Sequence, residues 1–375
     1  MKKSKVCVVG LDGATWKVLD PLIKKNKLPF IESIISSSFY GTLLSPTPSL
    51  SAPSWASFMT GVNPGKHSIF DFVDLREVED KPRMNSSKDI KAPRIWDILG
   101  DLKIKSLIIN MPLTYPLQKM SGVMVSSFLT PKGADYVYPK KYQQLLDDID
   151  YELDILTDEK LGTFPSKKMS KEVRKVYLDK IIEISRKRLK AYKLLNDVDD
   201  FSFSFLLFKE TDIAQHLFWE ESELGAYYQE LDKILRDLYK YVNSKSKNTY
   251  FVLMSDHGFH KTPTWEISIY SWLRKEMNTL VKGKTSWSVL SSVNKKIKKY
   301  GLSPTSMSTV KKIRGDILKD SKVTFARENG FLVSWQGLFN FGGIKDKSEL
   351  NAIAKKLTRE KYRGKKVFKF VKRSD

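Results

Sequence analysis

The sequence predicts an α/β fold with a mostly parallel central sheet and helices on both faces. Apolar runs of strand length alternate along the chain with amphipathic segments of helix length. Strands that are apolar on both faces are typical of parallel sheets covered by helices. A chain of 375 residues, of which 41% are hydrophobic, is also long enough to bury the core that such a sheet needs.

The predicted strands are short apolar runs, several of which end at a polar or turn residue. They are Val6–Leu11, Tyr40–Leu44, Lys105–Asn110, Val123–Ser127, Phe203–Phe208 and Thr249–Met254. The predicted helices have apolar residues at helical spacing, and some begin at Ser or with Pro in the first turn, as helices favour. They are Leu19–Lys27, Pro29–Ser37, Ser51–Met59, Ala92–Leu102, Lys167–Leu195 and Glu223–Val242.

The chain is strongly basic, with 65 Lys and Arg against 43 Asp and Glu and a net charge of +22. Between Ser271 and Asp320 there are twelve Lys and Arg and only three acidic residues. Such a stretch attracts phosphate, whether in nucleic acid, anionic lipid or a phosphorylated substrate. A solvated lysine-rich surface is the alternative. Because the stretch has no nucleic-acid motif, the expected partner is a phosphorylated small molecule or lipid substrate.

The single cysteine, Cys7, excludes a disulfide framework and a cysteine-rich zinc module. It favours a reducing compartment, so we expect a cytoplasmic protein. The apolar run near the N-terminus is too short for a secretory signal, and no run is suited to cross a membrane.

Acidic and histidine side chains follow three of the predicted strands. Asp12 follows the first strand, Asp212 and His216 follow Phe203–Phe208, and Asp256 and His257 follow the last strand. Each feature alone has an ordinary explanation, such as a helix cap or a chance pair. Because the carboxyl ends of parallel strands meet at one edge of a sheet, however, these groups should lie together there. Their combination predicts a metal site, since a cation offsets the repulsion within an acidic cluster.

Five segments carry a resemblance to a known family, in the same order along the chain. They are residues 8–13 (VVGLDG), 48–55 (PSLSAPSW), 60–67 (TGVNPGKH), 211–216 (TDIAQH) and 254–259 (MSDHGF). The chain resembles the type I phosphodiesterase/nucleotide pyrophosphatase branch of the alkaline phosphatase superfamily. The resemblance implies an alkaline phosphatase-like fold and a phosphoric ester hydrolase. We expect one such domain over residues 1–375, either complete or truncated at its C-terminus, with a helical insertion at 136–200 and a basic insertion at 277–320.

The resemblance also implies a Ser or Thr nucleophile nine positions before the Thr of a Thr-Gly pair. Counting back from Thr60 leads to Ser51, at the start of a predicted helix. The expected reaction proceeds through a covalent phosphoseryl-type intermediate. Backbone amides at the helix start would face a bound phosphate. Ser49 and Ser54 are the alternative nucleophiles, and a helix-capping serine is the alternative role for Ser51.

The family further implies two divalent ions, with zinc expected and manganese as the alternative. One ion would be held by Asp12, Asp256 and His257 and would touch Ser51. The other would be held by Asp212, His216 and a third histidine. No histidine follows His260 in this chain, so the second site is expected to be weak or the chain truncated.

The roles of the two remaining histidines are left open. We expect His67 to play a supporting role near the site, and His260 either to line the site or to lie exposed on a loop.

Residues 69–72 lack the Asn that nucleotide pyrophosphatases use to steady phosphoryl oxygens, which argues against a nucleotide substrate. The alternative functions are a phosphomutase or phosphotransferase of the superfamily, or a catalytically impaired basic binding protein. A sulfatase is disfavoured because Trp55 replaces the Arg of the sulfatase motif.

Overall fold

The computed structural model describes residues 4–74, 83–154 and 169–261, together with Lys355 and four two-residue strands beyond residue 331. The chain divides into two compact units. The first comprises Met1–Phe72, Asn85–Gly162 and Met169–Lys261. The second comprises Val73–Met84, Thr163–Lys168 and Thr262–Asp375. All the site residues discussed below lie in the first unit.

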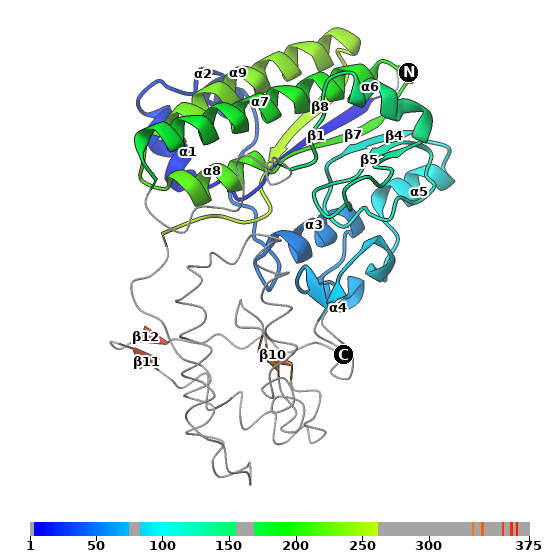
Figure 1. Cartoon of the computed structure of the whole chain (residues 1–375), viewed down its shortest axis with the longest axis horizontal. Helices are drawn as coiled ribbons and strands as arrows, with labels where there is room; N and C mark the ends of the chain where they lie inside the picture. The colour runs from blue at the N-terminus through cyan, green and yellow to red at the C-terminus, as the bar shows by residue number, and fades with distance from the viewer. Residues whose placement is uncertain are drawn as a thin grey trace. The chain divides into compact units, whose positions relative to one another are not determined.

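The first unit is built on a six-stranded sheet with the order β6-β5-β4-β7-β1-β8 (Figure 1). Its strands are β1 (Lys5–Leu11), β4 (Ser106–Ile109), β5 (Gly122–Val125), β6 (Val137–Tyr138), β7 (Phe203–Phe208) and β8 (Thr249–Met254). All neighbouring pairs are parallel except β5 and β6. The carboxyl ends of five strands therefore share one edge, where ligands collect in folds of this class.

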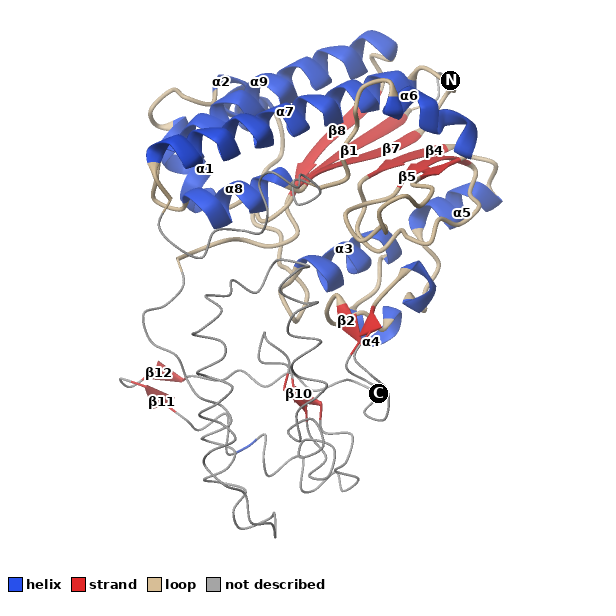
Figure 2. Cartoon of the chain, viewed as in Figure 1, coloured by secondary structure: helices blue, strands red, loops and turns tan. Residues whose placement is uncertain are grey.

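Helices cover both faces of this sheet, with α7 and α9 on one face and α3 and α5 on the other (Figure 2). The α-helices are α1 (Trp16–Ile23), α2 (Pro29–Ser37), α3 (Ser51–Thr60), α4 (Pro64–His67), α5 (Ile95–Asp101), α6 (Gln143–Asp147), α7 (Lys171–Asn196), α8 (Glu210–Phe218) and α9 (Ser222–Lys245). The described part of the unit also contains two 3₁₀ turns, η1 (Ser87–Asp89) and η2 (Lys140–Tyr142). This architecture confirms the predicted α/β class with its mostly parallel sheet.

The core between the sheet and α3 brings the start of that helix close to β1. Trp55 of α3 is fully buried and packs edge-to-face against Phe205 of β7, with ring centroids 5.6 Å apart. Gly10 permits this approach, because a Cβ at that position would lie 2.6 Å from the Trp55 ring. A larger residue at position 10 would push α3, and with it Ser51, away from the sheet.

The predicted strand Tyr40–Leu44 is wrong. This segment forms no regular structure and, within the described residues, pairs with no strand. Tyr40 is 68% exposed and Leu44 is 88% exposed. An apolar run of strand length predicts a strand only where a neighbouring strand accepts its hydrogen bonds.

The described strands of the second unit form antiparallel pairs. They are β2 (Val73–Asp74) with β3 (Arg83–Met84), β9 (Leu332–Val333) with β10 (Phe339–Asn340), and β11 (Lys361–Tyr362) with β12 (Lys365–Lys366). The predicted basic stretch Ser271–Asp320 and the proposed insertion at 277–320 lie outside the described residues.

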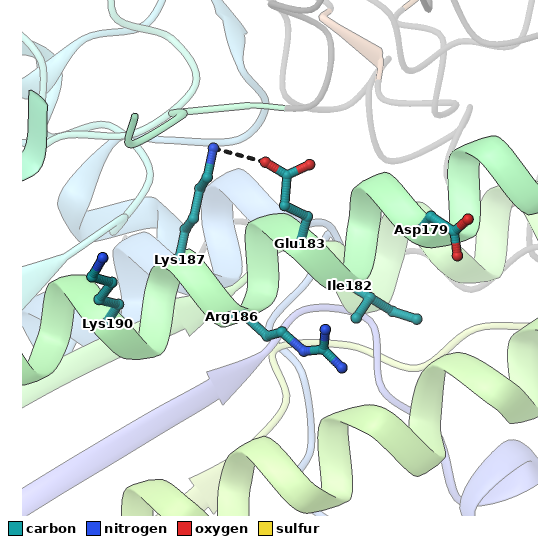
Figure 3. Close-up of a pocket in the computed structure, with 6 residues that line it drawn as sticks. All are labelled: Asp179, Ile182, Glu183, Arg186, Lys187 and Lys190. Carbon is teal, nitrogen blue, oxygen red and sulfur yellow. Dashed lines mark ion pairs between the residues drawn. The ribbon is translucent and has the colours of Figure 1, made fainter. Parts of the chain in front are cut away.

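A surface hollow of about 470 Å³ lies along α7 (Figure 3). The residues that line it are Asp179, Ile182, Glu183, Arg186, Lys187 and Lys190. None of the candidate site residues borders this hollow, and Glu183 pairs with Lys187 at 2.8 Å. In the part of the chain that is described, no helix is both long and apolar enough to cross a membrane.

Candidate active site

Four segments bring the predicted site residues to the carboxyl edge of the sheet. Asp12 directly follows β1, and Asp256 and His257 follow β8. Ser51 is the first residue of α3, and Asp212 lies in the first turn of α8, the helix after β7. The parallel arrangement of β7, β1 and β8 explains why residues about 200 positions apart meet here.

The Ser51 hydroxyl contacts two of the predicted ligand side chains. Its Oγ donates a hydrogen bond to Asp12 Oδ1 at 3.2 Å and lies 2.9 Å from Nε2 of His257. The other oxygen of Asp12 accepts a hydrogen bond from the Trp55 indole at 3.1 Å. Because Ser51 and Trp55 lie on the first turns of the same helix, α3 holds the Asp12 carboxylate through both of its oxygens.

The Asp256 carboxylate is tied to the turn after β1 through only one of its oxygens. Its Oδ1 accepts a hydrogen bond from the Gly13 amide at 3.0 Å. Its Oδ2 is buried and has no hydrogen-bond partner among the described residues, although Nε2 of His257 lies 3.3 Å away. The backbone carbonyl of Asp256 accepts a hydrogen bond from Ser45 Oγ at 2.6 Å. A buried carboxylate oxygen without a partner is costly unless a cation binds it.

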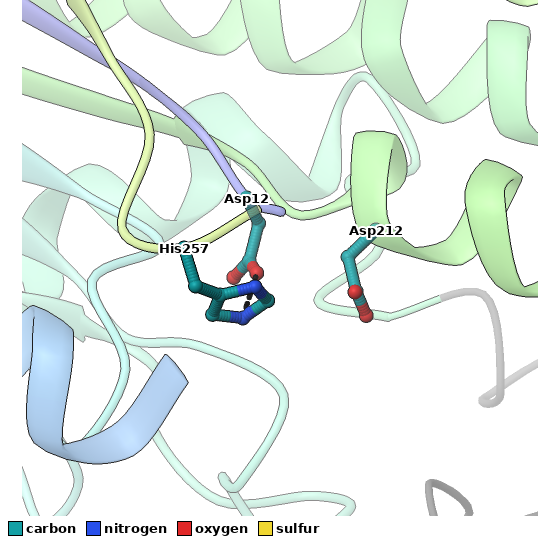
Figure 4. Close-up of side chains that lie close together, drawn as sticks. All are labelled: Asp12, Asp212 and His257. Carbon is teal, nitrogen blue, oxygen red and sulfur yellow. Dashed lines mark ion pairs between the residues drawn. The ribbon is translucent and has the colours of Figure 1, made fainter. Parts of the chain in front are cut away.

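Donor atoms of Asp12, Asp212 and His257 all lie within 4.8 Å of one another (Figure 4). Figure 4 shows the His257 ring and the two carboxyl groups pointing toward a common space. Two carboxylates and an imidazole are suitable ligands for zinc or manganese. This donor set fits a divalent metal ion, and Oδ2 of Asp256 lies beside it, 3.3 Å from Nε2 of His257.

The charges of this cluster alter its protonation. Burial, together with the neighbouring Asp256 and Asp212, raises the pKa of Asp12 well above its usual value. Burial also raises the pKa of Asp256, to about 6. For His257 burial lowers the pKa, but the carboxylates of Asp256, Asp12 and Asp212 outweigh burial and raise it to about 9. A protonated His257 then donates to Ser51 Oγ through Nε2, so a proton occupies a position that suits a metal ion.

Asp212 and His216 face each other one turn apart on α8. Nε2 of His216 lies 3.5 Å from Oδ2 of Asp212. The His216 ring packs edge-to-face against Phe259, with centroids 4.7 Å apart. Asp212 thus lies close both to His216 and to the donor atoms of Asp12 and His257. His260 is exposed, and its Nδ1 pairs with the backbone carbonyl of Lys261 at 2.7 Å.

His67, the predicted supporting residue, is fully buried at the end of α4. Its Nδ1 accepts a hydrogen bond from the Ile69 amide at 3.1 Å, so the proton of the neutral ring lies on Nε2. That nitrogen is 2.9 Å from Ser57 Oγ and donates to it. His67 therefore fixes the chain after α3 and makes none of the contacts that join the site residues.

Acidification is expected to destabilise the protein through His67. Burial lowers the pKa of His67 from 6.5 to about 4. The unfolded chain binds a proton at this residue below pH 6.5, whereas the folded chain does not bind one until about pH 4. The contribution of His67 to the free energy of unfolding should therefore be constant above pH 6.5 and fall by about 3 kcal/mol between pH 6.5 and pH 4.

Denaturant unfolding of the wild type and His67→Gln at several pH values between 7 and 4 tests this expectation. Glutamine keeps a hydrogen-bonding amide but does not titrate. The variant should lose less stability on acidification than the wild type. Identical pH dependence in the two proteins would rule out this role of His67.

Several residues that support the site were not predicted for their roles. The Trp55 indole, the Gly13 amide and the Gln215 amide each hydrogen-bond to a ligand side chain or to the turn that carries one. All three residues lie within the motif segments, and this position in the sequence was the only indication of a role at the site. Their roles depend on contacts between segments far apart in the chain, which spacing alone does not reveal.

The fold and this edge of the sheet define an α/β protein with a mostly parallel sheet and with a hydroxyl, carboxylates and imidazoles grouped together. A model of the family described as type I phosphodiesterase/nucleotide pyrophosphatase matches residues 6–324. The chain therefore belongs to this family. No curated protein matches the chain.

Solved structures with a similar fold include two of phosphonoacetate hydrolase from Sinorhizobium meliloti 1021. The complex with phosphonoacetate has 16% identity and a TM-score of 0.52, and the complex with phosphonoformate has 18% identity and a TM-score of 0.50. Murine ectonucleotide pyrophosphatase/phosphodiesterase 5, in complex with AMP, has 17% identity and a TM-score of 0.45. Each match covers 73% of this chain, and the chain spans only 62% of the length of each of these proteins. At this identity the likeness concerns the fold.

Proposed function

We propose that the chain is a metal-dependent phosphoesterase of the phosphodiesterase/pyrophosphatase type, with Ser51 as nucleophile. The observation that carries the proposal is the position of Ser51 Oγ, within hydrogen-bond distance of both Asp12 and His257. A serine placed only to cap a helix does not need two ligand-type side chains at its hydroxyl. Family membership supports the same reaction class.

In the proposed reaction Ser51 Oγ attacks the phosphorus of a phosphate ester. The Oγ–P bond forms, the bond from phosphorus to the leaving oxygen breaks, and water later cleaves the phosphoseryl ester. Asp12 Oδ1, at 3.2 Å, is placed to accept the hydroxyl proton. The backbone amides of Ser51 and Ala52, in the first turn of α3, would face the phosphoryl oxygens. Divalent ions held by Asp12, Asp256 and His257, and by Asp212 and His216, would supply the positive charge that activates the hydroxyl and offsets the phosphate.

The substrate is proposed to be a phosphorylated small molecule or a lipid rather than a nucleotide. The segment 69–72, where nucleotide pyrophosphatases have an Asn, reads Ile-Phe-Asp-Phe and contains no Asn. The Phe72 ring packs edge-to-face against Phe128, with centroids 5.4 Å apart. An aromatic ring in this packing provides no amide to a phosphoryl oxygen, which supports a substrate other than a nucleotide.

Hydrolysis of a chromogenic phosphodiester, bis(p-nitrophenyl) phosphate, tests the proposal. Activity is expected in the purified chain, is expected to be lost after treatment with a chelator, and should return when Mn²⁺ or Zn²⁺ is added. Zinc is expected to be the native ion and manganese a working substitute. Activity that resists chelation would contradict metal dependence. No hydrolysis with either ion would favour a basic binding protein on the same fold.

A further inference from the structure

Helix α8 carries two pairs of side chains, and the two members of each pair lie one helical turn apart. Asp212 and His216 form the pair that is partly accessible and faces the candidate ion site. Thr211 and Gln215, each one position earlier, are completely buried. Residues four apart lie on the same face of a helix, so α8 presents ligands on one face and an anchoring pair on the adjacent face.

The anchoring pair binds the backbone of the turn that carries Asp12. Thr211 Oγ1 donates to the carbonyl of Asp12 at 2.6 Å and also lies 2.8 Å from the carbonyl of Phe208. Nε2 of Gln215 donates to the carbonyl of Gly13 at 2.7 Å. This hydrogen bond determines which way the side-chain amide of Gln215 is turned, because exchanging its nitrogen and oxygen would place Oε1 against the carbonyl oxygen of Gly13. Two successive carbonyls of one turn are thus held by two successive turns of α8.

Gly13 directly follows Asp12 and lies close to the segments that carry Asp212 and His257. Its amide donates to Asp256, and its carbonyl accepts from Gln215. Its φ of +66° is in the left-handed region that favours glycine. A Cβ there would lie 3.0 Å from Oδ1 of Asp212 and 3.3 Å from Cε1 of His257. Small displacements of α8 relative to this turn would therefore change the spacing of the ligand side chains.

The burial of Gln215 carries a stability penalty that needs an explanation. Its Oε1 has no hydrogen-bond partner among the described residues. Leaving a buried amide oxygen unpaired opposes folding, and an apolar side chain of similar length would avoid this cost. The hydrogen bond from Gln215 to the carbonyl of Gly13 accounts for the presence of an amide side chain at position 215 despite this penalty.

We propose that Thr211 and Gln215 are positioning residues, which anchor α8 to the Asp12–Gly13 turn and so set the separation of Asp212 from Asp12 and His257. The inference rests on the proposed ion site. In this inference the hydrogen bonds of Thr211 and Gln215 set the geometry of the ion site, although neither side chain is proposed to bind an ion or to contact Ser51. Removing either bond should weaken ion binding while the fold is retained.

Titration of the ion-free chain with Mn²⁺, with free Mn²⁺ measured by electron paramagnetic resonance, tests the inference without using turnover. Thr211→Val and Gln215→Met remove the two hydrogen bonds with little change in volume. Each should raise the dissociation constant for Mn²⁺ by roughly 10–100-fold, as loss of a residue that supports a metal ligand typically does. Thr211→Ser keeps the hydroxyl and should bind Mn²⁺ as the wild type does.

Thr114→Val is the matched control. Thr114 is also buried, and its Oγ1 donates to the carbonyl of Met111 at 2.7 Å. This variant should lose comparable thermal stability with no change in Mn²⁺ affinity, which separates positioning from general destabilisation. Wild-type affinity in both Thr211→Val and Gln215→Met, or equal loss in Thr114→Val, would overturn the inference and leave the proposed function intact. A wild-type chain that binds no ion would instead contradict the proposed function, and the inference with it.

Discussion

Replacing Ser51 with Ala is expected to reduce phosphodiester hydrolysis by roughly 10³–10⁶-fold, the range seen when a catalytic nucleophile is removed. The substitution deletes the oxygen that lies against Asp12 and His257 but removes no carboxylate or imidazole. The affinity for Mn²⁺ should therefore fall far less than turnover. Steady-state kinetics and Mn²⁺ titration of the same preparation measure the two effects side by side.

Ser49→Ala and Ser54→Ala are the controls, because these serines are the alternative nucleophiles in the same segment. Ser49 is exposed, whereas Ser54 is buried in α3 with no hydrogen-bond partner for its Oγ among the described residues. Both variants should keep most of the wild-type turnover. If Ser51→Ala retains more than a few per cent of activity, or if Ser54→Ala abolishes it, the assignment of the nucleophile is wrong.

Replacing Asp12 with Asn should abolish ion binding and turnover together. Asp12 is 2% exposed, and its two oxygens accept hydrogen bonds from Ser51 and Trp55. Asparagine has nearly the same shape but carries no charge, so the site loses a carboxylate ligand. The loss of Mn²⁺ affinity should exceed the roughly 100-fold typical for a residue that only supports a ligand. The same titration and the same hydrolysis assay measure both quantities.

Asp232→Asn provides a matched control for a buried aspartate outside the site. Asp232 accepts hydrogen bonds from the amides of Phe30 and Ile31 at 3.0 and 2.8 Å. Its substitution should lower stability but leave the affinity for Mn²⁺ unchanged. An Asp12→Asn variant that lost turnover and kept full ion affinity would refute a shared site for Asp12 and the ion.

Much of the fold follows from local sequence signals. The runs Phe203–Phe208 and Thr249–Met254 form β7 and β8 with the predicted bounds, because they are apolar and enclosed by polar or turn residues. Pro29–Ser37 forms α2 as predicted, with Pro in the first turn. The Tyr40–Leu44 prediction failed because strand formation depends on a partner strand, which the local sequence does not specify.

The composition of the candidate site was also predictable, but the way its members are grouped was not. Parallel topology places residues that follow β1 and β8 at one edge, which is why Asp12 and His257 meet. Sequence order assigned Asp212 to a separate ion with His216. The structure also places an oxygen of Asp212 within 4.8 Å of donor atoms of Asp12 and His257. This proximity depends on how α8 docks on the turn after β1, which is a tertiary contact.

The most direct test of the central claim is capture of the covalent intermediate on Ser51. The chain would be mixed with a phosphodiester and Mn²⁺, quenched in acid during turnover, digested and analysed by mass spectrometry. The account predicts a phosphoryl adduct on the peptide that contains Ser51, located at that residue by fragmentation and absent after chelation. Turnover with an adduct on another residue, or with no adduct on Ser51 at any quench time, would contradict it.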